Sequence, residues 1–220
     1  MKPYYQSRSV TIYHGDCLEI IPELTTVDLV VTDPPYGINT KSDGSGKLSP
    51  WADLCNAAFW YAEWLKQCRS KLSKHGALWS FLNWRSLTTF QKASCDLRWP
   101  IESLLVWDKG CIGPGGAKGL RPIYELVALF TNEDFAIPNR SLSDVQKWHW
   151  PTTKKYHPAE KPVQGIEWLI NASGNQSIIL DPFMGSGTTL VAAQKLGRGV
   201  IGIEQDERYC EVAAKRLVIN

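Results

Sequence analysis

Short β-branched apolar runs alternate along the chain with segments whose apolar residues recur at helical spacing. The runs predict strands at 9–14, 27–32, 76–83, 101–107, 123–130, 177–181 and 199–204. The segments between them predict helices at 18–24, 52–73, 84–97, 163–172 and 188–196, and a last amphipathic helix after 204. Strands joined by helices form parallel sheets, so the sequence predicts an α/β fold: a mostly parallel sheet with helices on both faces.

One domain accounts for the whole length. The 220 residues, 44% of them hydrophobic, suffice for one buried α/β core and leave little for a second. We therefore expect a single domain over 1–220. Between 131 and 156 the alternation gives way to polar, proline-containing sequence, which predicts an insertion without regular core structure. The glycine-rich stretch 110–119 predicts a loop.

Composition excludes several classes of protein. Lys plus Arg number 24 and Asp plus Glu 22, so any nucleic-acid contact must come from local patches. The six cysteines form no C-x-x-C pair and no cluster with histidine, which argues against a zinc site or a disulfide framework. No signal-peptide core and no apolar run of membrane-spanning length is visible. We expect a cytoplasmic protein without metal or membrane association.

A glycine turn follows one predicted strand. The strand ends in Asp181 and runs through the sequence PFMGSGTT into a predicted helix. Glycines let a ligand approach the bare backbone, and free N–H groups at a helix start favour a carboxylate or phosphate. Glu204 ends the next strand, where an acid of a nucleotide-binding fold accepts hydrogen bonds from ribose hydroxyls. Since no Gly-Lys-Ser/Thr follows, the turn is not a P-loop, and the combination predicts an adenosine-type ligand.

A proline turn, Asp33-Pro34-Pro35-Tyr36, follows the predicted strand 27–32 at its carboxyl end, where parallel sheets build their sites. Its prolines fix the backbone, so a carboxylate, a carbonyl and an aromatic ring are held together. A nucleobase amino group is a poor nucleophile because its lone pair is delocalised, and a catalyst must favour a pyramidal nitrogen. The Asp33 carboxylate and the Pro34 carbonyl can each accept one amino N–H. Tyr36 can stack on a base flipped out of the duplex.

At these residues the chain resembles the amino-methylating DNA methyltransferases, the adenine-N6 and cytosine-N4 enzymes often paired with restriction systems. In that family the D-P-P-Y turn holds the target amino group, and the D-P-F-x-G-S-G-T turn holds S-adenosylmethionine. The resemblance implies a Rossmann-like, S-adenosylmethionine-dependent methyltransferase fold. Because the catalytic turn comes first in the chain, the motif order resembles the circularly permuted, beta-type arrangement. The implied cofactor-binding residues include Asp181, Phe183, Gly185, Gly187, Thr188 and Glu204.

Further matching stretches add candidate residues. Gly15-Asp16 borders the cofactor site in relatives, so Asp16 is a predicted cofactor contact, with a helix cap as the alternative. Lys161-Pro162 is similar to a segment beside the methionine end, so Lys161 is predicted to pair with a cofactor carboxylate, with a solvent-exposed position as the alternative.

Target recognition falls to the segment 131–156, which is shorter than the corresponding insertion of relatives. Its basic and aromatic residues could bind phosphates and stack on bases, and Trp148, Lys154 and Lys155 are the predicted DNA contacts. The alternative is that the aromatic side chains simply pack on the domain.

The resulting prediction is an S-adenosylmethionine-dependent methyltransferase acting on adenine N6 in double-stranded DNA with the target base flipped. An Asp-first turn is adenine-typical in the family, and cytosine N4 is the alternative.

An RNA substrate stays open because a flipped base presents the same edge in either polymer. Protein-glutamine methylation is disfavoured because those enzymes resemble an N-P-P-Y turn placed after the cofactor turn. Carbon-5 methylation needs a Pro-Cys pair that the chain lacks. A non-enzymatic DNA-binding regulator is disfavoured because both motifs are intact, while a homodimer stays open.

Overall fold

The computed structural model describes residues 1–36, 54–112, 119–150, 156 and 160–219. Its strands are β1 (Tyr5–Gln6), β2 (Val10–His14), β3 (Val27–Thr32), β4 (Leu72–Leu82), β5 (Ser103–Asp108), β6 (Tyr124–Thr131), β7 (Val145–Lys147), β8 (Ile178–Asp181) and β9 (Gly199–Glu204). Its helices are α1 (Cys17–Ile20), the 3-10 turn η1 (Ile21–Glu23), α2 (Leu54–Lys71), α3 (Leu87–Asp96), α4 (Val163–Ala172), α5 (Thr188–Lys195) and α6 (Glu207–Ile219).

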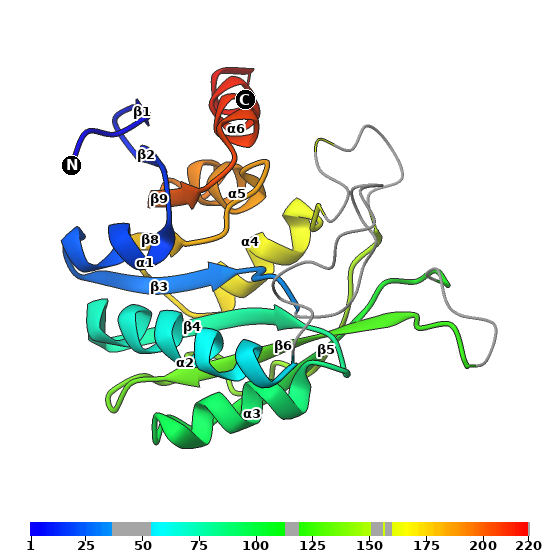
Figure 1. The fold of residues 1–220 in the computed structure, drawn as a ribbon. Coiled ribbons are helices and arrows are strands. Elements are labelled where there is room, and N and C mark those ends of the chain that lie inside the picture. Colours follow the sequence, from blue (N-terminus) through cyan, green and yellow to red (C-terminus); the bar gives the residue numbers. More distant parts are fainter. Residues whose placement is uncertain (37–53, 113–118, 151–155, 157–159, 220) are drawn as a thin grey trace.

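The strands of the described residues form one sheet in the order β1-β2-β9-β8-β3-β4-β6-β5-β7 (Figure 1). The central strands β2, β9, β8, β3 and β4 run parallel, as do β5 and β7. Only β1 and β6 run antiparallel to their neighbours among these strands. The predicted mostly parallel α/β sheet is thereby confirmed. We call the edge at which β3, β4, β8 and β9 end the carboxyl edge.

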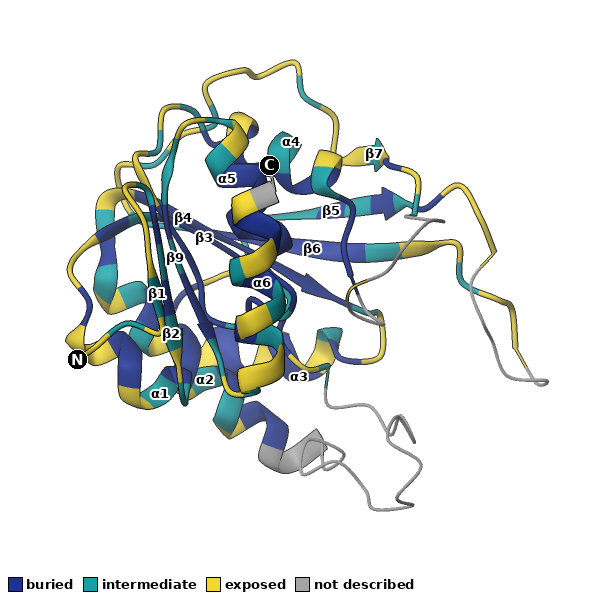
Figure 2. Ribbon diagram, turned by 90° about the horizontal axis from the view of Figure 1, so that it is seen from above, coloured by how far each residue is buried: buried dark blue, intermediate teal, exposed yellow. Residues whose placement is uncertain are grey.

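Helices cover both faces of this sheet. Helices α4, α5 and α6 pack on one face and α1, α2 and α3 on the other, each with its own core cluster. Successive strand residues point to opposite faces, so Val30 and Val31 of β3 are both fully buried but under different helices. This is why the predicted strands read as continuous apolar runs. Figure 2 shows the buried central strands and the exposed outer side of α6.

The predicted elements are present with small shifts of their ends. The helix predicted at 18–24 is α1 followed by η1, and β4 begins at Leu72, earlier than predicted. Residues 52 and 53 of the helix predicted at 52–73 lie outside the described residues, as does 113–118 of the predicted loop. The short strand β1 was not predicted, because two residues carry no periodicity.

The prediction for 131–156 is wrong in one respect. Strand β7 lies within this segment and pairs in parallel with β5 at the edge of the sheet. The next residue, Trp148, is 3% exposed and joins the core on the α4 face. Its ring lies where Gly165 leaves room, since a Cβ on Gly165 would come within 2.7 Å of Trp148 Cε3. The end of the predicted insertion is therefore part of the fold.

Candidate active site

The proline turn and the glycine turn lie at the same edge of the sheet. Strands β3 and β8 are parallel neighbours, with Leu29 opposite Ile179 and Val30 opposite Leu180. Both therefore end at the carboxyl edge. Thr32, the last residue of β3, donates a hydrogen bond from Oγ1 to Oδ1 of Asp181, the last residue of β8, at 2.8 Å. The two turns, distant in sequence, start from hydrogen-bonded neighbours.

Asp33 is held by two side chains. Lys161 Nζ lies 2.7 Å from its Oδ2, and the Tyr36 hydroxyl donates to its Oδ1 at 2.6 Å. Burial raises the pKa of Asp33, Lys161 opposes this rise, and the carboxylate of Glu125 adds to it. The turn itself is fixed from α2, because the Tyr61 hydroxyl donates to the Pro35 carbonyl at 2.7 Å. The structure thus brings Asp33 and Tyr36 together as the motif predicted.

Glu125 of β6 completes this cluster and was not predicted. Its carboxylate lies 3.2 Å from Lys161 Nζ and 3.5 Å from Lys109 Nζ, and it accepts a hydrogen bond from the Tyr36 hydroxyl at 3.2 Å. The sequence carried one signal: a lone acid inside the apolar run IYELVALF. A carboxylate buried in an apolar strand needs a polar or charged partner, but the sequence alone does not show which residue folding will bring to it.

Lys161 is buried, so the solvent-exposed alternative is wrong. Its side chain is 6% exposed and its partners within the chain are Asp33 and Glu125, while its pairing with a cofactor carboxylate stays a prediction. Burial lowers the pKa of Lys161, but the two carboxylates raise it more, and its pKa lies above the ordinary value. Lys161 therefore stays charged and belongs to the same cluster as Asp33 and Glu125.

The glycine turn has the backbone that its sequence predicted. Gly185 and Gly187 have φ of +49° and +81°, in the left-handed region that favours glycine. Gly187 is the N-cap of α5 and gives that helix no side-chain cap. Burial raises the pKa of Asp181 to about 6, with hydrogen bonds from Thr189 and Thr32 opposing the rise. The acid that opens the turn is therefore fully charged only above that pH.

Glu204 lies beside the glycine turn at the end of β9. Its Oε2 accepts the Gly185 N–H at 3.0 Å and its Oε1 accepts the Asp206 N–H at 2.8 Å. Each carboxylate oxygen has a second lone pair for a ligand hydroxyl. Gly15, in turn, donates its N–H to the Glu204 carbonyl at 3.0 Å. The Gly15-Asp16 turn and Glu204 therefore meet, as the predicted cofactor site requires.

The remaining predicted cofactor residues are near this turn but have structural partners too. Asp16 is the N-cap of α1, its Oδ1 accepting the Leu18 N–H at 2.8 Å, so the helix-cap alternative holds whether or not it also contacts a ligand. Phe183 is half-buried, with its ring centroid 5.3 Å from that of Trp60. Thr188 is buried at the start of α5.

A second buried ion pair supports the glycine turn and was also missed. Glu160 and Arg216 of α6 are 2.8 Å apart and both nearly inaccessible. The same guanidinium donates to the Ser186 carbonyl at 2.8 Å and lies 4.5 Å from the Tyr156 ring centroid. These contacts tie the segment before α4, the last helix and the glycine turn together.

Of the three predicted DNA contacts, only Trp148 lies among the described residues. Trp148 cannot stack on a base, because its ring is buried against α4 and its carbonyl accepts the Trp107 indole N–H at 2.7 Å. The alternative reading of core packing is correct for it. Lys154 and Lys155 lie outside the described residues.

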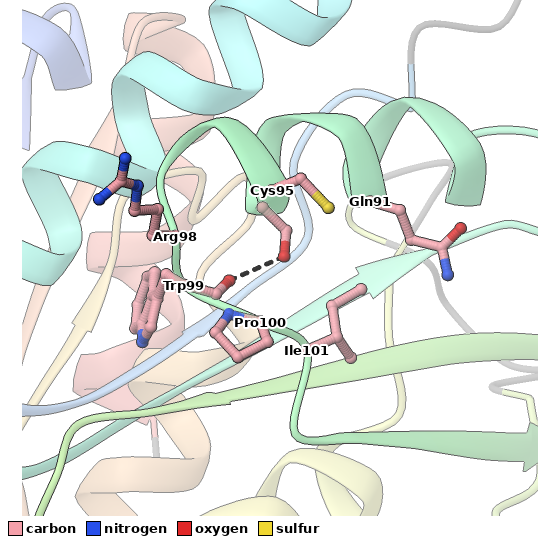
Figure 3. A pocket seen from close by; sticks show the side chains of 7 residues that line it. Gln91, Cys95, Arg98, Trp99, Pro100 and Ile101 are labelled. Atoms are coloured by element: carbon pink, nitrogen blue, oxygen red, sulfur yellow. Dashed lines mark hydrogen bonds between the residues drawn. The ribbon is translucent and has the colours of Figure 1, made fainter.

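A surface pocket lies at the other end of the sheet from both turns, where α3 ends and β5 begins (Figure 3). Its lining includes Gln91, Cys95, Arg98 and Ile101, and the Ser94 hydroxyl donates to the Trp99 carbonyl at 2.7 Å. Within the described ranges, no three His, Cys, Asp or Glu side chains gather as a metal site. None of the helices described is long and apolar enough to cross a membrane.

Comparison with known proteins now gives these features a family. A family model described as DNA methylase, for N6 and N4 methyltransferases, matches residues 27–215. The Type II methyltransferase M.ScaI of Streptomyces caespitosus is 28% identical, covering 98% of this chain and 84% of that protein. The DNA adenine methyltransferase YhdJ of Escherichia coli is 28% identical, over 97% of this chain and 84% of that protein.

Solved structures share the fold. The crystal structure of the M1.HpyAVI–SAM complex matches with a TM-score of 0.74 and 24% identity, over 94% of this chain and 98% of that one. The cytosine-N4-specific PvuII DNA methyltransferase matches with a TM-score of 0.80 and 17% identity, over 98% of this chain and 88% of that one. The fold, the two turns and the family match agree, and the chain belongs to the N6/N4 family of DNA methylases.

Proposed function

We propose that the chain transfers a methyl group from S-adenosylmethionine to N6 of adenine in DNA, with Asp33, Pro34 and Tyr36 acting on the base. The observation that carries the proposal is the 2.8 Å hydrogen bond from Thr32 to Asp181, which joins the strands from which the two turns start. A methyl donor on one turn and a base on the other would be neighbours, and transfer depends on such proximity.

The glycine turn fits S-adenosylmethionine in its backbone, its charge and its acid. Gly185 has no side chain to stand between its backbone and a ligand, and Gly187, where a Cβ would meet Ala213 Cβ at 2.8 Å, lets the turn pack closely on α6. The start of α5 has no side-chain cap, which leaves the positive end of that helix for a carboxylate. Glu204 retains lone pairs for ribose hydroxyls. The bound group supplies an electrophilic methyl on a positively charged sulfur.

The proline turn would prepare the amino nitrogen. Asp33 and the Pro34 carbonyl each accept one N–H, which favours the pyramidal nitrogen and frees its lone pair. As that lone pair forms the new bond to the methyl carbon, the carbon–sulfur bond would break and its electron pair would leave with the sulfur as a neutral thioether. The positively charged product nitrogen would then lose one proton. Asp33, whose pKa is raised by burial, is placed to receive it. The Tyr36 ring stacks on the flipped base.

Adenine is the preferred base because the proline turn begins with Asp, and the relative YhdJ is named an adenine methyltransferase. Cytosine N4 is the second candidate, favoured by the fold of the PvuII enzyme. Incubation of unmethylated DNA with labelled S-adenosylmethionine, followed by mass analysis of nucleosides, should give N6-methyladenine. N4-methylcytosine in its place would contradict the adenine assignment. Label in RNA or in a protein but not in DNA would contradict the DNA substrate.

An exposed aromatic–cation pair at the carboxyl edge is a candidate DNA contact. Since Ser80 of β4 pairs with Thr32, the residues after Leu82 lie at the same edge as the proline turn. There Trp84 is 55% exposed, with the Arg85 guanidinium 5.1 Å from its ring centroid. A ring with one free face can stack on a base and an arginine can bind a phosphate.

Replacing Trp84 with alanine should weaken DNA binding by about tenfold, the order of one lost base-stacking contact. Trp84→Phe keeps a stacking ring and should recover most of the affinity. Arg85→Ala should lower the slope of log affinity against log salt by about one. Fluorescence anisotropy with labelled duplex measures all three. Val218→Ala, at an exposed apolar side chain of α6, is the control, and equal losses for Trp84→Ala and Val218→Ala would rule out this contact.

A further inference from the structure

We call Asp33, Tyr36, Lys109, Glu125 and Lys161 the proline-turn cluster. It contains more charged side chains than methyl transfer by Asp33 and Pro34 requires. Asp33 and Glu125 supply two carboxylates, and Lys109 and Lys161 supply two ammonium groups. The Glu125 side chain is 13% exposed and the two lysine side chains 9% and 6%. Burying an ion pair costs about as much as it returns in stability, so stability alone is a weak reason for this cluster.

Tyr36 has one hydroxyl proton and two carboxylate acceptors. Its oxygen lies 2.6 Å from Asp33 Oδ1 and 3.2 Å from Glu125 Oε2. The pKa of Tyr36 is raised well above its ordinary value, first by burial and then by the two carboxylates, so the hydroxyl keeps its proton. That proton can point fully at only one acceptor at a time. In this structure the shorter bond goes to Asp33.

The Tyr36 hydroxyl donates to an Asp33 oxygen that a substrate amino N–H would also use. That oxygen has a second lone pair for the amino N–H, but the bond from the hydroxyl draws negative charge from it and makes it a weaker acceptor. Asp33 therefore accepts the amino N–H best when the hydroxyl proton turns away. If the hydroxyl proton of Tyr36 turned to a place with no acceptor, a buried hydrogen-bond donor would be left unsatisfied, which costs free energy. Glu125 Oε2 lies within 3.2 Å of the same hydroxyl and removes that cost. Lys161 contacts both carboxylates, so it also retains a partner while Asp33 is engaged.

We propose that Glu125 is a positioning residue that takes over the Tyr36 hydroxyl hydrogen bond and thereby frees Asp33 for the amino group of the target base. The exchange is a rotation about the C–O bond of Tyr36, with no bond broken and no proton transferred. Lys109 holds Glu125 in place from the opposite side, at 3.5 Å. The inference rests on the proposed role of Asp33 as the acceptor of an amino N–H.

A double-variant cycle tests this exchange. In Glu125→Gln, one amide oxygen replaces two carboxylate oxygens, and two lysines compete with the hydroxyl for it. The hydroxyl then stays on Asp33, and we expect kcat in single-turnover methyl transfer to fall by about tenfold or more. The KM for DNA and the Kd for S-adenosylmethionine should stay within about twofold, because neither involves the exchange.

The decisive member of the cycle is the double variant. Tyr36→Phe keeps the ring but removes the hydroxyl, so Asp33 is free without help from Glu125. Glu125→Gln combined with Tyr36→Phe should therefore be faster than Glu125→Gln alone, by at least about threefold. A double variant no faster than Glu125→Gln, or a Glu125→Gln protein with wild-type kcat, would overturn the proposal.

The acid limb of the kcat/KM–pH profile, which reports pKa values of the free enzyme, gives an independent readout. The charged or titratable groups facing Asp33 are Lys161, Glu125, Tyr36, Tyr61 and Asp181. The Glu125 charge raises the pKa of Asp33 and the Tyr36 hydrogen bond lowers it. Glu125→Gln should therefore move the acid limb to lower pH, and Tyr36→Phe should move it to higher pH. Shifts in the same direction for both variants would also count against the exchange.

Control variants distinguish a loss of the hydroxyl exchange from a loss of folding or of methyl transfer in general. Glu102→Gln, an exposed acid just before β5, should leave kcat and the pH profile unchanged. Glu125→Asp keeps both acceptor oxygens and should retain more activity than Glu125→Gln. If Glu125→Gln does not fold, Glu125→Asp, alone and combined with Tyr36→Phe, replaces it in the cycle, and a double variant no faster than Glu125→Asp would overturn the proposal. An active Asp33→Ala protein would sink the proposed function as well, whereas strictly additive effects of the two substitutions would sink the exchange alone.

Discussion

Asp33→Ala should lower single-turnover methyl transfer by at least about 100-fold, the usual cost of removing one preorganised group that stabilises a transition state. The variant loses the carboxylate that accepts an amino N–H and receives the product proton. Binding of S-adenosylmethionine should stay within about twofold, because the glycine turn keeps its own contacts with Glu204. Calorimetry measures binding, and labelled methyl transfer to DNA measures the rate. The fold should persist, since Lys161 retains Glu125 as a partner.

Two further variants sharpen this result. Asp33→Asn keeps the shape but replaces one acceptor with an N–H donor facing the amino group, and we expect at least about a tenfold loss. Asp96→Ala removes a surface acid on α3 that pairs with Lys92 in an exposed i,i+4 contact, and it should leave methyl transfer and cofactor binding unchanged. Near-normal transfer by Asp33→Ala would refute the catalytic role of the proline turn.

Gly185→Val should raise the Kd for S-adenosylmethionine by at least about tenfold, equivalent to about 1.4 kcal/mol. Gly185 has φ of +49°, which a β-branched residue adopts at a cost, and its N–H is bonded to Glu204. The substitution therefore strains the turn and places a side chain at its surface. Isothermal calorimetry gives the Kd, and thermal unfolding gives the change in stability.

Gly197→Val is the matched control for backbone strain. Gly197 follows α5 at the end remote from the carboxyl edge, has φ of +68°, and a Cβ there would meet nothing within 4 Å. Both variants should lose about 1–2 kcal/mol of unfolding free energy from the left-handed backbone. Only Gly185→Val should also lose cofactor affinity. Equal Kd values for the two proteins would argue against a cofactor site on the glycine turn.

Local sequence predicted the sheet, its covering helices and the position of both turns. Strands such as β3 are continuous apolar runs ended by Asp-Pro, and parallel strands necessarily end at one edge. The pairing of Thr32 with Asp181 follows from these two facts once β3 and β8 are neighbours. For this part of the site, spacing and residue type were sufficient.

Long-range polar contacts were not predictable in the same way. Glu125 reaches Tyr36 and Lys161 only because β6 lies beside β4, a pairing that a single sequence does not encode locally. Arg216 and Glu160 likewise meet across the domain. The two carboxylate partners of Lys161 were not predicted for the same reason, because only folding brings Asp33 and Glu125 to it.

The prediction that Trp148 contacts DNA was wrong for a different reason. A three-residue edge strand such as β7 is too short to show a period, and the polar residues around it resemble a solvated loop. The compensating signal was Gly165, a glycine inside a helix, where the missing side chain makes room for the Trp148 ring. Neither residue is informative without the other.

The anchoring of β7 and Trp148 limits how the enzyme could be re-engineered. Exchange of 131–156 for a longer recognition module from a relative would remove an edge strand of the sheet and leave a hole over Gly165. A graft that retains Val145–Trp148, together with Phe135 and Ile137, which pack on the same core, would keep the hydrophobic layer under α4 closed. Within residues 131–148, an exchange that leaves this core intact is therefore confined to the residues between Ile137 and Val145.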